Sequence, residues 1–245
     1  MTPLGPEIVF EDNHLLVAVK PVNMPTQADA TGDRDFLTWL KEYLKIRHQK
    51  PGNVFLGLIH RLDRPVGGIM VFAKTSKAAG RLSEQVRDRQ FHKSYLAVVH
   101  GSPANPAGRL RHYLFKDQGL NRVAVVPATT PGAKEAVLDY QTMATAAGMT
   151  LVKVNLLTGR SHQIRVQFAA IGHPLYGDQK YGADRNRPGQ QIALWSAGLA
   201  FAHPVTKQGL SFQSLPPRQF PWVTYDVEVV TLGEVIHNGS GTETV

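Results

Sequence analysis

The sequence has 245 residues, of which 42% are hydrophobic, and it carries a formal net charge of +8. This length and composition predict one large domain or two small ones, with an apolar core. The basic balance favours a polyanionic partner such as nucleic acid, since each Lys or Arg that meets a phosphate releases a counterion. The sequence contains no cysteine, which excludes disulfides, cysteine-ligated zinc and a thiolate nucleophile.

Several common signals are missing from the sequence. Met1–Glu7 lacks the basic run and apolar core of a signal peptide. No apolar run reaches the ~20 residues that cross a membrane, and no Walker loop, GxGxxG or HExxH pattern occurs. We therefore expect a soluble, cytoplasmic and monomeric protein with no membrane partner, no metal and no cofactor, nucleotide cofactors included.

The first third of the chain is predicted to alternate strands with helices. Strands are predicted at Ile8–Phe10 and Leu15–Val19. Asp33 is positioned to cap a helix with a single apolar stripe, formed by Phe36, Leu37, Leu40, Tyr43 and Leu44. A buried strand at Gly68–Lys74 precedes a helix over Ser76–Arg89, which is capped by its first residue.

The remainder of the chain is rich in predicted strands. Lys93–His100 alternates in the way that a strand does, and further strands are predicted at Tyr113–Phe115, Val123–Val126, Ala136–Met143 and Leu151–Leu156. A helix is predicted between Ser161 and Gly172. Closing strands are predicted at Ile192–Phe201 and Thr224–Val230.

This order of elements predicts a single α+β domain over residues 1–233, built on a large and mainly antiparallel sheet. The last stretch, residues 234–245, is polar and built from small side chains, which predicts a flexible tail. No internal repeat or clean linker divides the chain.

A polar cluster follows the short apolar segment Gly57–Ile59. It contains His60, Arg61, Asp63 and Arg64, and a proline with two glycines then forces a turn. A carboxylate between two arginines stays ionised, which suits an oxygen nucleophile and not a general acid. The alternative is a surface loop held by ion pairs, which are common and contribute little to stability.

A second polar cluster begins the helix that follows Gly159. Its members are Arg160, Ser161, His162, Gln163 and Arg165. Two guanidiniums and the free N–H groups of a first helical turn form an anion site, either for a phosphate or for the Asp63 carboxylate. The alternative is an ordinary capped helix start.

Two further segments combine polar and aromatic residues. In the strand at Lys93–His100, Lys93 and Tyr95 share one face, so the tyrosine can stack on a base or simply pack in the core. The turn-rich segment Gly172–Gly182 is either structural or directed at a substrate. Its composition does not distinguish the two interpretations.

Taken together, these segments resemble the RluA-type pseudouridine synthases. His60–Asp63 is similar to the family's HRLD motif, and Lys93–Tyr95 is similar to its KxY motif. Thr158–Arg165 resembles its TGRxHQIR motif, and Gly177–Gly182 resembles its GDxxYG turn. The opening segment Phe10–Pro21 resembles the family's first hairpin, and the motifs occur in the family's order.

The resemblance implies a pseudouridine synthase fold, in which helices and loops flank a large sheet around a central cleft. It also implies that a uridine in ribosomal or transfer RNA is isomerised to pseudouridine without a cofactor. Asp63 would be the nucleophile or proton acceptor at the ribose, and Arg165 would pair with it. Tyr95 would stack on the uracil and help to remove the C5 proton.

The resemblance further implies contacts to RNA. Arg61 would fill the space left by a flipped nucleotide or hold its phosphate, and Leu194 would make apolar contact beside Tyr95. Other contacts are expected from His60, Arg64, Lys93, Arg160, His162 and Gln163. Because the resemblance begins at Ile8, we expect a catalytic domain without the N-terminal S4 RNA-binding domain that many members carry.

One departure from the family concerns Val66–Gly68, where many members have Thr-Ser-Gly. Two hydroxyls near Asp63 are therefore missing, together with any RNA contact that they would make. Two other functions remain as alternatives, a non-catalytic RNA-binding protein and a hydrolase that acts on a sugar. The hydrolase would need two carboxylates flanking the bond, and the other acid within these motifs is Asp178.

Overall fold

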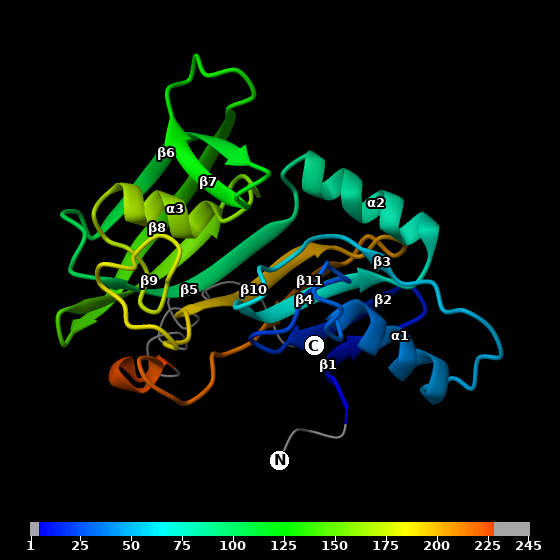
Figure 1. The fold of residues 1–245 in the computed structure, drawn as a ribbon. Helices are drawn as coiled ribbons and strands as arrows, with labels where there is room; N and C mark the ends of the chain where they lie inside the picture. The colour runs from blue at the N-terminus through cyan, green and yellow to red at the C-terminus, as the bar shows by residue number, and fades with distance from the viewer. Residues whose placement is uncertain (1–4, 228–245) are drawn as a thin grey trace, which may run out of the picture.

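The computed structural model describes residues 5–227, which form one mixed β-sheet of eleven strands, three α-helices and one 3-10 helix (Figure 1). The strands are β1 Glu7–Glu11, β2 Leu15–Lys20, β3 Gly57–Leu58, β4 Gly67–Ala73, β5 His92–His100, β6 Ala107–Asp117, β7 Arg122–Val126, β8 Lys134–Ala146, β9 Met149–Leu156, β10 Leu194–Ala202 and β11 Gly209–Gln213. The helices are α1 Phe36–Arg47, α2 Ser76–Arg87, α3 Gln163–Ala170 and the 3-10 helix Trp222–Tyr225. None of these helices is long and apolar enough to cross a membrane.

The strand order across the sheet is β1-β2-β4-β10-β5-β9-β8-β6-β7, with β11 paired to β10 and β3 paired to β4. All of these pairs are antiparallel except β4 and β10, which run parallel where Gly67–Gly68 lies beside Trp195–Ser196. The predicted α+β fold with a mainly antiparallel sheet is therefore confirmed.

Strands β2 and β4 are buried on both faces, which explains why their sequences are continuously apolar. Their even-numbered side chains, such as Leu16 and Phe72, pack with α1 in the main core. Their odd-numbered side chains, such as Val17 and Val71, pack with α2. Figure 1 shows these two helices on opposite faces of this half of the sheet. Helix α3 covers the other half, where Phe168 enters the main core.

The observed helix caps differ by one or two residues from the predicted ones. Asp35, not Asp33, caps α1, because its carboxylate accepts a hydrogen bond from the Thr38 N–H at 3.0 Å. Thr75, not Ser76, caps α2, because its extended backbone directs its hydroxyl toward the N–H groups of the first turn. Both corrections concern side-chain geometry and leave the predicted helices in place.

The C-terminal end differs most from the prediction. The predicted strand Thr224–Val230 is wrong over its first residues, which belong to the 3-10 helix. Trp222 and Tyr225 are three residues apart, so one tight turn buries both side chains against the sheet. The end of that predicted strand and the predicted tail at 234–245 lie outside the described residues. β11 is an unpredicted strand, although its exposed and half-buried residues alternate as in an edge strand.

The parallel contact between β4 and β10 leaves no room for side chains on β4 at its start. A Cβ atom at Gly67 would lie 2.3 Å from Cζ3 of Trp195. Gly68 has a φ of +119°, and its Cβ would lie 2.3 Å from the Ser196 carbonyl oxygen. The neighbouring Val66 is buried in the main core. The departure from the family's Thr-Ser-Gly therefore coincides with a crowded, apolar contact to the Trp195 ring.

This crowding predicts the effect of restoring a serine. We expect Gly67→Ser to lower the free energy of unfolding by about 1–3 kcal/mol, because the added atoms overpack the Trp195 ring. The loss should be smaller in a Trp195→Leu background. Urea denaturation of the wild type, the two single variants and the double variant would measure this difference. Gly80→Ser on α2 is the matched control, since no atom lies within 4 Å of a Cβ there. Equal losses at both glycines would contradict the overpacking explanation.

Candidate active site

Asp63 lies in the loop between β3 and β4, and this loop is fixed from both sides. The hydroxyl of Thr26 donates to the Leu62 carbonyl at 2.8 Å and accepts from the Leu62 N–H at 3.2 Å. The ammonium of Lys20 donates to the Arg64 carbonyl at 3.2 Å. The backbone is therefore held before and after Asp63, while the Asp63 side chain is 28% exposed.

Lys20 is a fully buried cation near this loop. Besides Arg64, it donates to the carbonyls of Pro21 and Met24, at 2.9 and 2.6 Å. Burial lowers the pKa of Lys20 to about 7, although the negative charge of Asp63 acts in the opposite direction. Three carbonyls thus hold one ammonium, which joins the end of β2 to the Asp63 loop.

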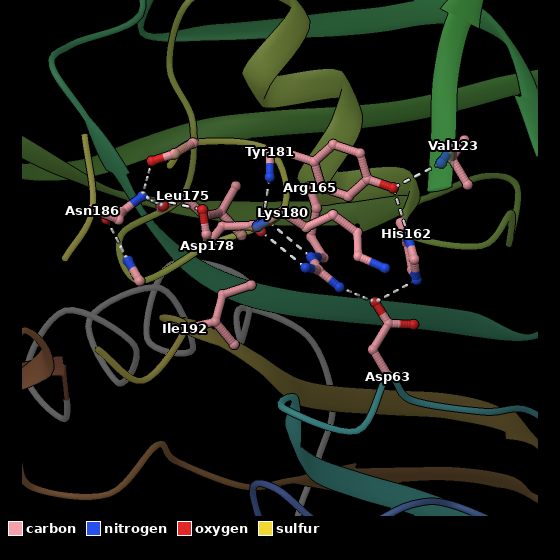
Figure 2. Close-up of polar contacts among 12 residues, drawn as sticks. Asp63, Val123, His162, Arg165, Leu175, Asp178, Lys180, Tyr181, Asn186 and Ile192 are labelled. Carbon is pink, nitrogen blue, oxygen red and sulfur yellow. Dashed lines mark hydrogen bonds and ion pairs between the residues drawn. The ribbon is translucent and has the colours of Figure 1, made fainter. Parts of the chain in front are cut away.

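Arg165, on α3, forms the central ion pair of the site. Its Nη1 donates to Oδ2 of Asp63 at 2.9 Å. Its Nε and Nη2 donate to the two oxygens of Asp178 at 2.8 and 2.9 Å. Burial alone would lower the pKa of Arg165, but its bonds to Asp178 and the charges of both carboxylates raise it instead. The ion pair that the resemblance implies between Arg165 and Asp63 is therefore present (Figure 2).

The two oxygens of the Asp63 carboxylate have different surroundings. Oδ2 accepts the hydrogen bond from Arg165 and also lies 3.8 Å from Nε2 of His162. Oδ1 has no hydrogen bond or ion pair to any of the described residues, and Figure 2 shows it directed away from both partners. One oxygen thus fixes the orientation of the carboxylate, and the other is available to react.

The turn-rich loop after α3 is the support of Arg165. Asp178 has a fully buried side chain, and its Oδ1 also accepts the N–H groups of Lys180 and Tyr181. Asn186 holds the loop closed, accepting from the Gly177 N–H at 2.7 Å. The segment Gly172–Gly182 therefore has a structural role, because its Asp178 carboxylate aligns the Arg165 guanidinium.

A cleft of about 1370 Å³ opens above Asp63. Its walls come from distant parts of the chain, including the end of α2, the β6–β7 hairpin and the residues before α3. Basic side chains dominate the charged lining, namely Arg61, Arg64, Arg87, Arg89, Lys93, Lys116, Arg160, Arg165 and Lys180, against the two acids Asp29 and Asp63. This excess of positive charge fits a polyanion.

A smaller recess of about 60 Å³ lies at the floor of the cleft. Asp63 and Arg165 line it together with four other polar residues and six apolar or aromatic ones, namely Arg61, Arg160, His162 and Gln163, and Leu62, Val66, Tyr95, Leu156, Ile164 and Leu194. Tyr95 is 6% exposed, and burial followed by the nearby charge of Asp63 raises its pKa. The recess therefore combines the Asp63 carboxylate with apolar surface that suits the face of a base.

Three of the predicted RNA contacts line the cleft in positions that fit this role. Arg61 is exposed and has no ion pair or hydrogen bond within residues 5–227. Arg160 is also exposed, although its Nε donates to the Glu135 carbonyl at 2.9 Å. Lys93 is half-buried beside the ring of Phe91, and burial lowers its pKa.

Three other predicted contacts have polar groups that bond within the protein. Nε2 of His60 accepts the Val71 N–H at 3.2 Å, whereas its Nδ1 is buried without a hydrogen-bond partner among the described residues. Arg64 is paired with two acids, Asp29 and Asp33. The amide of Gln163, which is 3% exposed, is likewise bonded at both ends, with acceptors and donors supplied by Val137, Thr158 and Arg160.

Sequence patterns alone did not indicate the roles of Asp178, Tyr181 and Lys20. Asp178 and Tyr181 belong to a motif that looks like a turn, and only the fold places them behind Arg165 and His162. A Lys directly after the strand at Leu15–Val19 gives no sign that it is buried. The one signal that could have indicated Asp178 is that it is an acidic residue within one of the motifs, with no evident ion-pair partner in the sequence.

The environment of the half-buried His60 generates a prediction about acid stability. Burial, followed by the charge of Lys93, lowers its pKa to about 3, whereas an unfolded histidine titrates near 6.5. The unfolded chain therefore binds a proton first, and stability falls as the pH drops from about 6.5 toward 3. When the pH drops from 7 to 5, we expect the free energy of unfolding of His60→Gln to fall by roughly 2 kcal/mol less than that of the wild type.

Urea denaturation of both proteins at the two pH values would measure this difference. His92→Gln, which changes an exposed histidine of β5, is the matched control and should keep the wild-type pH dependence. Parallel curves for wild type and His60→Gln would show that His60 is not buried in its neutral form.

Comparison with known proteins gives a consistent result. A family model described as RNA pseudouridylate synthase matches residues 14–170. The ribosomal large subunit pseudouridine synthase D of Zymomonas mobilis is 32% identical over 222 residues, which cover 86% of this chain and 69% of that protein. The ribosomal large subunit pseudouridine synthase C of Buchnera aphidicola is 32% identical over 210 residues, covering 83% and 65%. This chain spans about two thirds of the length of these relatives.

A solved structure supports the same assignment. The human RNA pseudouridylate synthase domain containing 4 has a TM-score of 0.72 and 25% identity, with 86% of this chain and 89% of that chain covered. The segment matched by the family model contains Asp63, Tyr95 and Arg165. The chain therefore belongs to the RNA pseudouridylate synthase family as an RluA-type member, and its enzyme class is RNA pseudouridine synthase, an isomerase.

Proposed function

We propose that this chain converts a uridine of ribosomal RNA into pseudouridine, with Asp63 as the nucleophile. The observation that carries the proposal is the Asp63 carboxylate, whose Oδ2 is held by Arg165 at 2.9 Å where a basic cleft meets a partly apolar recess. The two bacterial relatives are named for the large ribosomal subunit, so ribosomal RNA is the first candidate and transfer RNA the second. Mapping pseudouridines in both RNA classes, with and without the gene, distinguishes these targets.

In the proposed reaction, Oδ1 of Asp63 attacks C1′ of the ribose while the C1′–N1 bond breaks, and its electron pair remains on the uracil. The uracil rotates within the recess, its C5 attacks C1′, and Asp63 leaves. Loss of the C5 proton and gain of a proton at N1 complete an isomerisation with no net change in atoms. Arg165 stabilises Asp63 as an anion before attack and as a leaving group afterwards.

Tyr95 has a narrower role in this proposal than the resemblance alone implies. Its raised pKa keeps the phenol protonated at neutral pH, so it is a poor base for the C5 proton. We assign to it contact with the face of the uracil, together with Leu194 and Val66 in the recess. Arg61 lines both the cleft and the recess, and Lys93 lines the wall of the cleft.

The cleft also has to receive a base that is normally stacked in RNA. Extruding a nucleotide costs a few kcal/mol, and phosphate contacts along the cleft can offset this cost. We propose that Arg61, which is exposed and unpaired among the described residues, occupies the space that the nucleotide leaves or holds its phosphate. The cytoplasmic location and the monomeric state stay predictions from the sequence.

The environment of Asp178 argues against a hydrolase. A glycosidase needs a second carboxylate on the other side of the scissile bond. The Asp178 side chain is fully buried, and both of its oxygens bond to Arg165. It cannot approach a sugar or activate a water molecule, so isomerisation is favoured over hydrolysis.

The first prediction from this proposal concerns Asp63→Asn. The amide keeps the shape of the side chain but is no nucleophile, so we expect isomerisation to fall at least ~10³-fold with RNA affinity largely retained. Tritium release from RNA labelled at uridine C5 measures turnover, and filter binding measures affinity. Asp139→Asn is the matched control, since this acid pairs with Arg109 at the surface and does not line the cleft. Substantial turnover by Asp63→Asn would remove Asp63 from the mechanism.

The second prediction concerns salt. If phosphates bind along the cleft, the logarithm of affinity should fall with the logarithm of salt concentration by about 0.7 per contact on single-stranded RNA. We expect Lys116→Ala, at the cleft, to reduce this slope by about 0.7. Lys45→Ala, on α1 and away from the cleft, should leave it unchanged. A slope that neither substitution alters would place the RNA elsewhere on the surface.

A further inference from the structure

A second line of contacts reaches Asp63 through His162, and the reaction proposed above does not use it. Nε2 of His162 lies 3.8 Å from Oδ2 of Asp63, and its Nδ1 lies 2.6 Å from the Tyr181 hydroxyl oxygen. That hydroxyl also accepts the N–H of Val123, on β7, at 2.9 Å. Figure 2 shows this line running from β7 to the carboxylate.

The position of the protons along this line follows from counting donors. The Val123 N–H can only donate, so it takes an acceptor site on the Tyr181 oxygen. The hydroxyl then has one proton to donate, and its near neighbour is Nδ1 of His162. A neutral imidazole that accepts at Nδ1 carries its proton on Nε2. The Nε2–H group is therefore on the side of the ring that faces Asp63.

The surroundings of His162 favour this neutral form. Burial lowers the pKa of His162, and the charges of Arg165, Lys180 and Lys116 act in the same direction. The charge of Asp63 acts in the opposite direction without outweighing them. At neutral pH the ring is therefore an uncharged donor and not a second cation beside Arg165.

Tyr181 is held firmly enough to impose this arrangement. Its N–H donates to Asp178 at 3.2 Å. The guanidinium carbons of Arg165 and Arg122 lie 5.3 and 5.6 Å from its ring centre, within the range of cation–π attraction. The backbone of His162 has a φ of 51°, a left-handed conformation that side chains rarely adopt. The imidazole is thus placed by an unusual backbone and oriented by a fixed tyrosine.

We propose that Tyr181 is a positioning residue, whose hydroxyl holds the His162 ring with its Nε2–H toward Oδ2 of Asp63. The opposite tautomer would turn a nitrogen lone pair toward the carboxylate, and the two would repel each other. With the Nε2–H in place, Arg165 and His162 both present N–H groups to Oδ2, and Oδ1 is left for the substrate. The effect on turnover rests on the proposed function, since it requires Asp63 to be the reacting group.

The direct test is the tautomer of His162 in the wild-type protein. Long-range ¹⁵N–¹H NMR distinguishes the two neutral tautomers and the protonated ring, and loss of the signal in His162→Gln identifies it. We expect a neutral ring protonated at Nε2 at neutral pH. In Tyr181→Phe we expect a mixture of tautomers or a partly protonated ring, because Nδ1 has lost its donor.

Kinetics test the consequence for turnover. We expect Tyr181→Phe to lower kcat about 5- to 10-fold, the effect of one lost hydrogen bond, with KM for RNA within about twofold of the wild type. Tyr140→Phe is the matched control, because that hydroxyl donates to the Asn105 carbonyl at 3.2 Å and does not line the cleft. It should change neither kcat nor the His162 signal, and melting temperatures of both variants separate a folding defect from a positioning defect.

The results of these tests of His162 and Tyr181 can be distinguished from those of the Asp63→Asn test. A wild-type His162 that is protonated at Nδ1, or at both nitrogens, overturns the proposal whatever the activity. An unchanged kcat in Tyr181→Phe, with Asp63→Asn inactive, overturns it and leaves the proposed function standing. If the wild type forms no pseudouridine in any RNA tested, the proposed function fails, and the NMR measurement still decides the tautomer.

Discussion

The site depends on one buried guanidinium that is shared by two carboxylates. Removing charges from water is costly, and a buried ion pair is stable only when its remaining hydrogen-bonding groups are also satisfied. Arg165 meets this condition because Asp178 binds the Nε and Nη2 edge and Asp63 binds Nη1. The two acids are not equivalent, since one is fully buried and the other is 28% exposed. The buried acid aligns the arginine, and the partly exposed one borders the cleft.

Much of the fold serves to bring these three charges together. α3 supplies Arg165, the loop after α3 supplies Asp178, and the β3–β4 loop supplies Asp63. The β3–β4 loop in turn rests on the buried ammonium of Lys20. Two basic groups thus border this loop, Lys20 beneath it and Arg165 beside it. The local electrostatics of the site therefore come from four separate segments of the chain.

The sequence allowed a good prediction wherever a local pattern carries the information. The runs of apolar residues in β2 and β4 and the apolar stripe of α1 indicated these elements correctly. The motifs also led to Asp63 and Arg165, but only because their order resembles a known family. Neither residue alone specifies its partner, because the contact joins positions that are far apart in the chain and is set by the register of the sheet.

Other features could not be predicted, for physical reasons that the structure makes clear. Whether Asp33 or Asp35 caps α1 depends on backbone angles, and Arg64 competes for the first of them. Whether a polar side chain faces a substrate depends on which of its atoms are already bonded, as for His60 and Gln163. Buried polar groups are bonded to partners from any part of the fold, and such partners leave no periodic trace in a sequence.

The continuity of the sheet has a mechanical consequence for this enzyme. One unbroken path of hydrogen-bonded strands carries both α2 and the β6–β7 hairpin, the elements whose ends wall the cleft. A sheet of this kind can twist, but separating its two halves as rigid bodies would break hydrogen bonds between neighbouring strands. The continuous sheet therefore limits how far the walls of the cleft can move apart when a substrate binds.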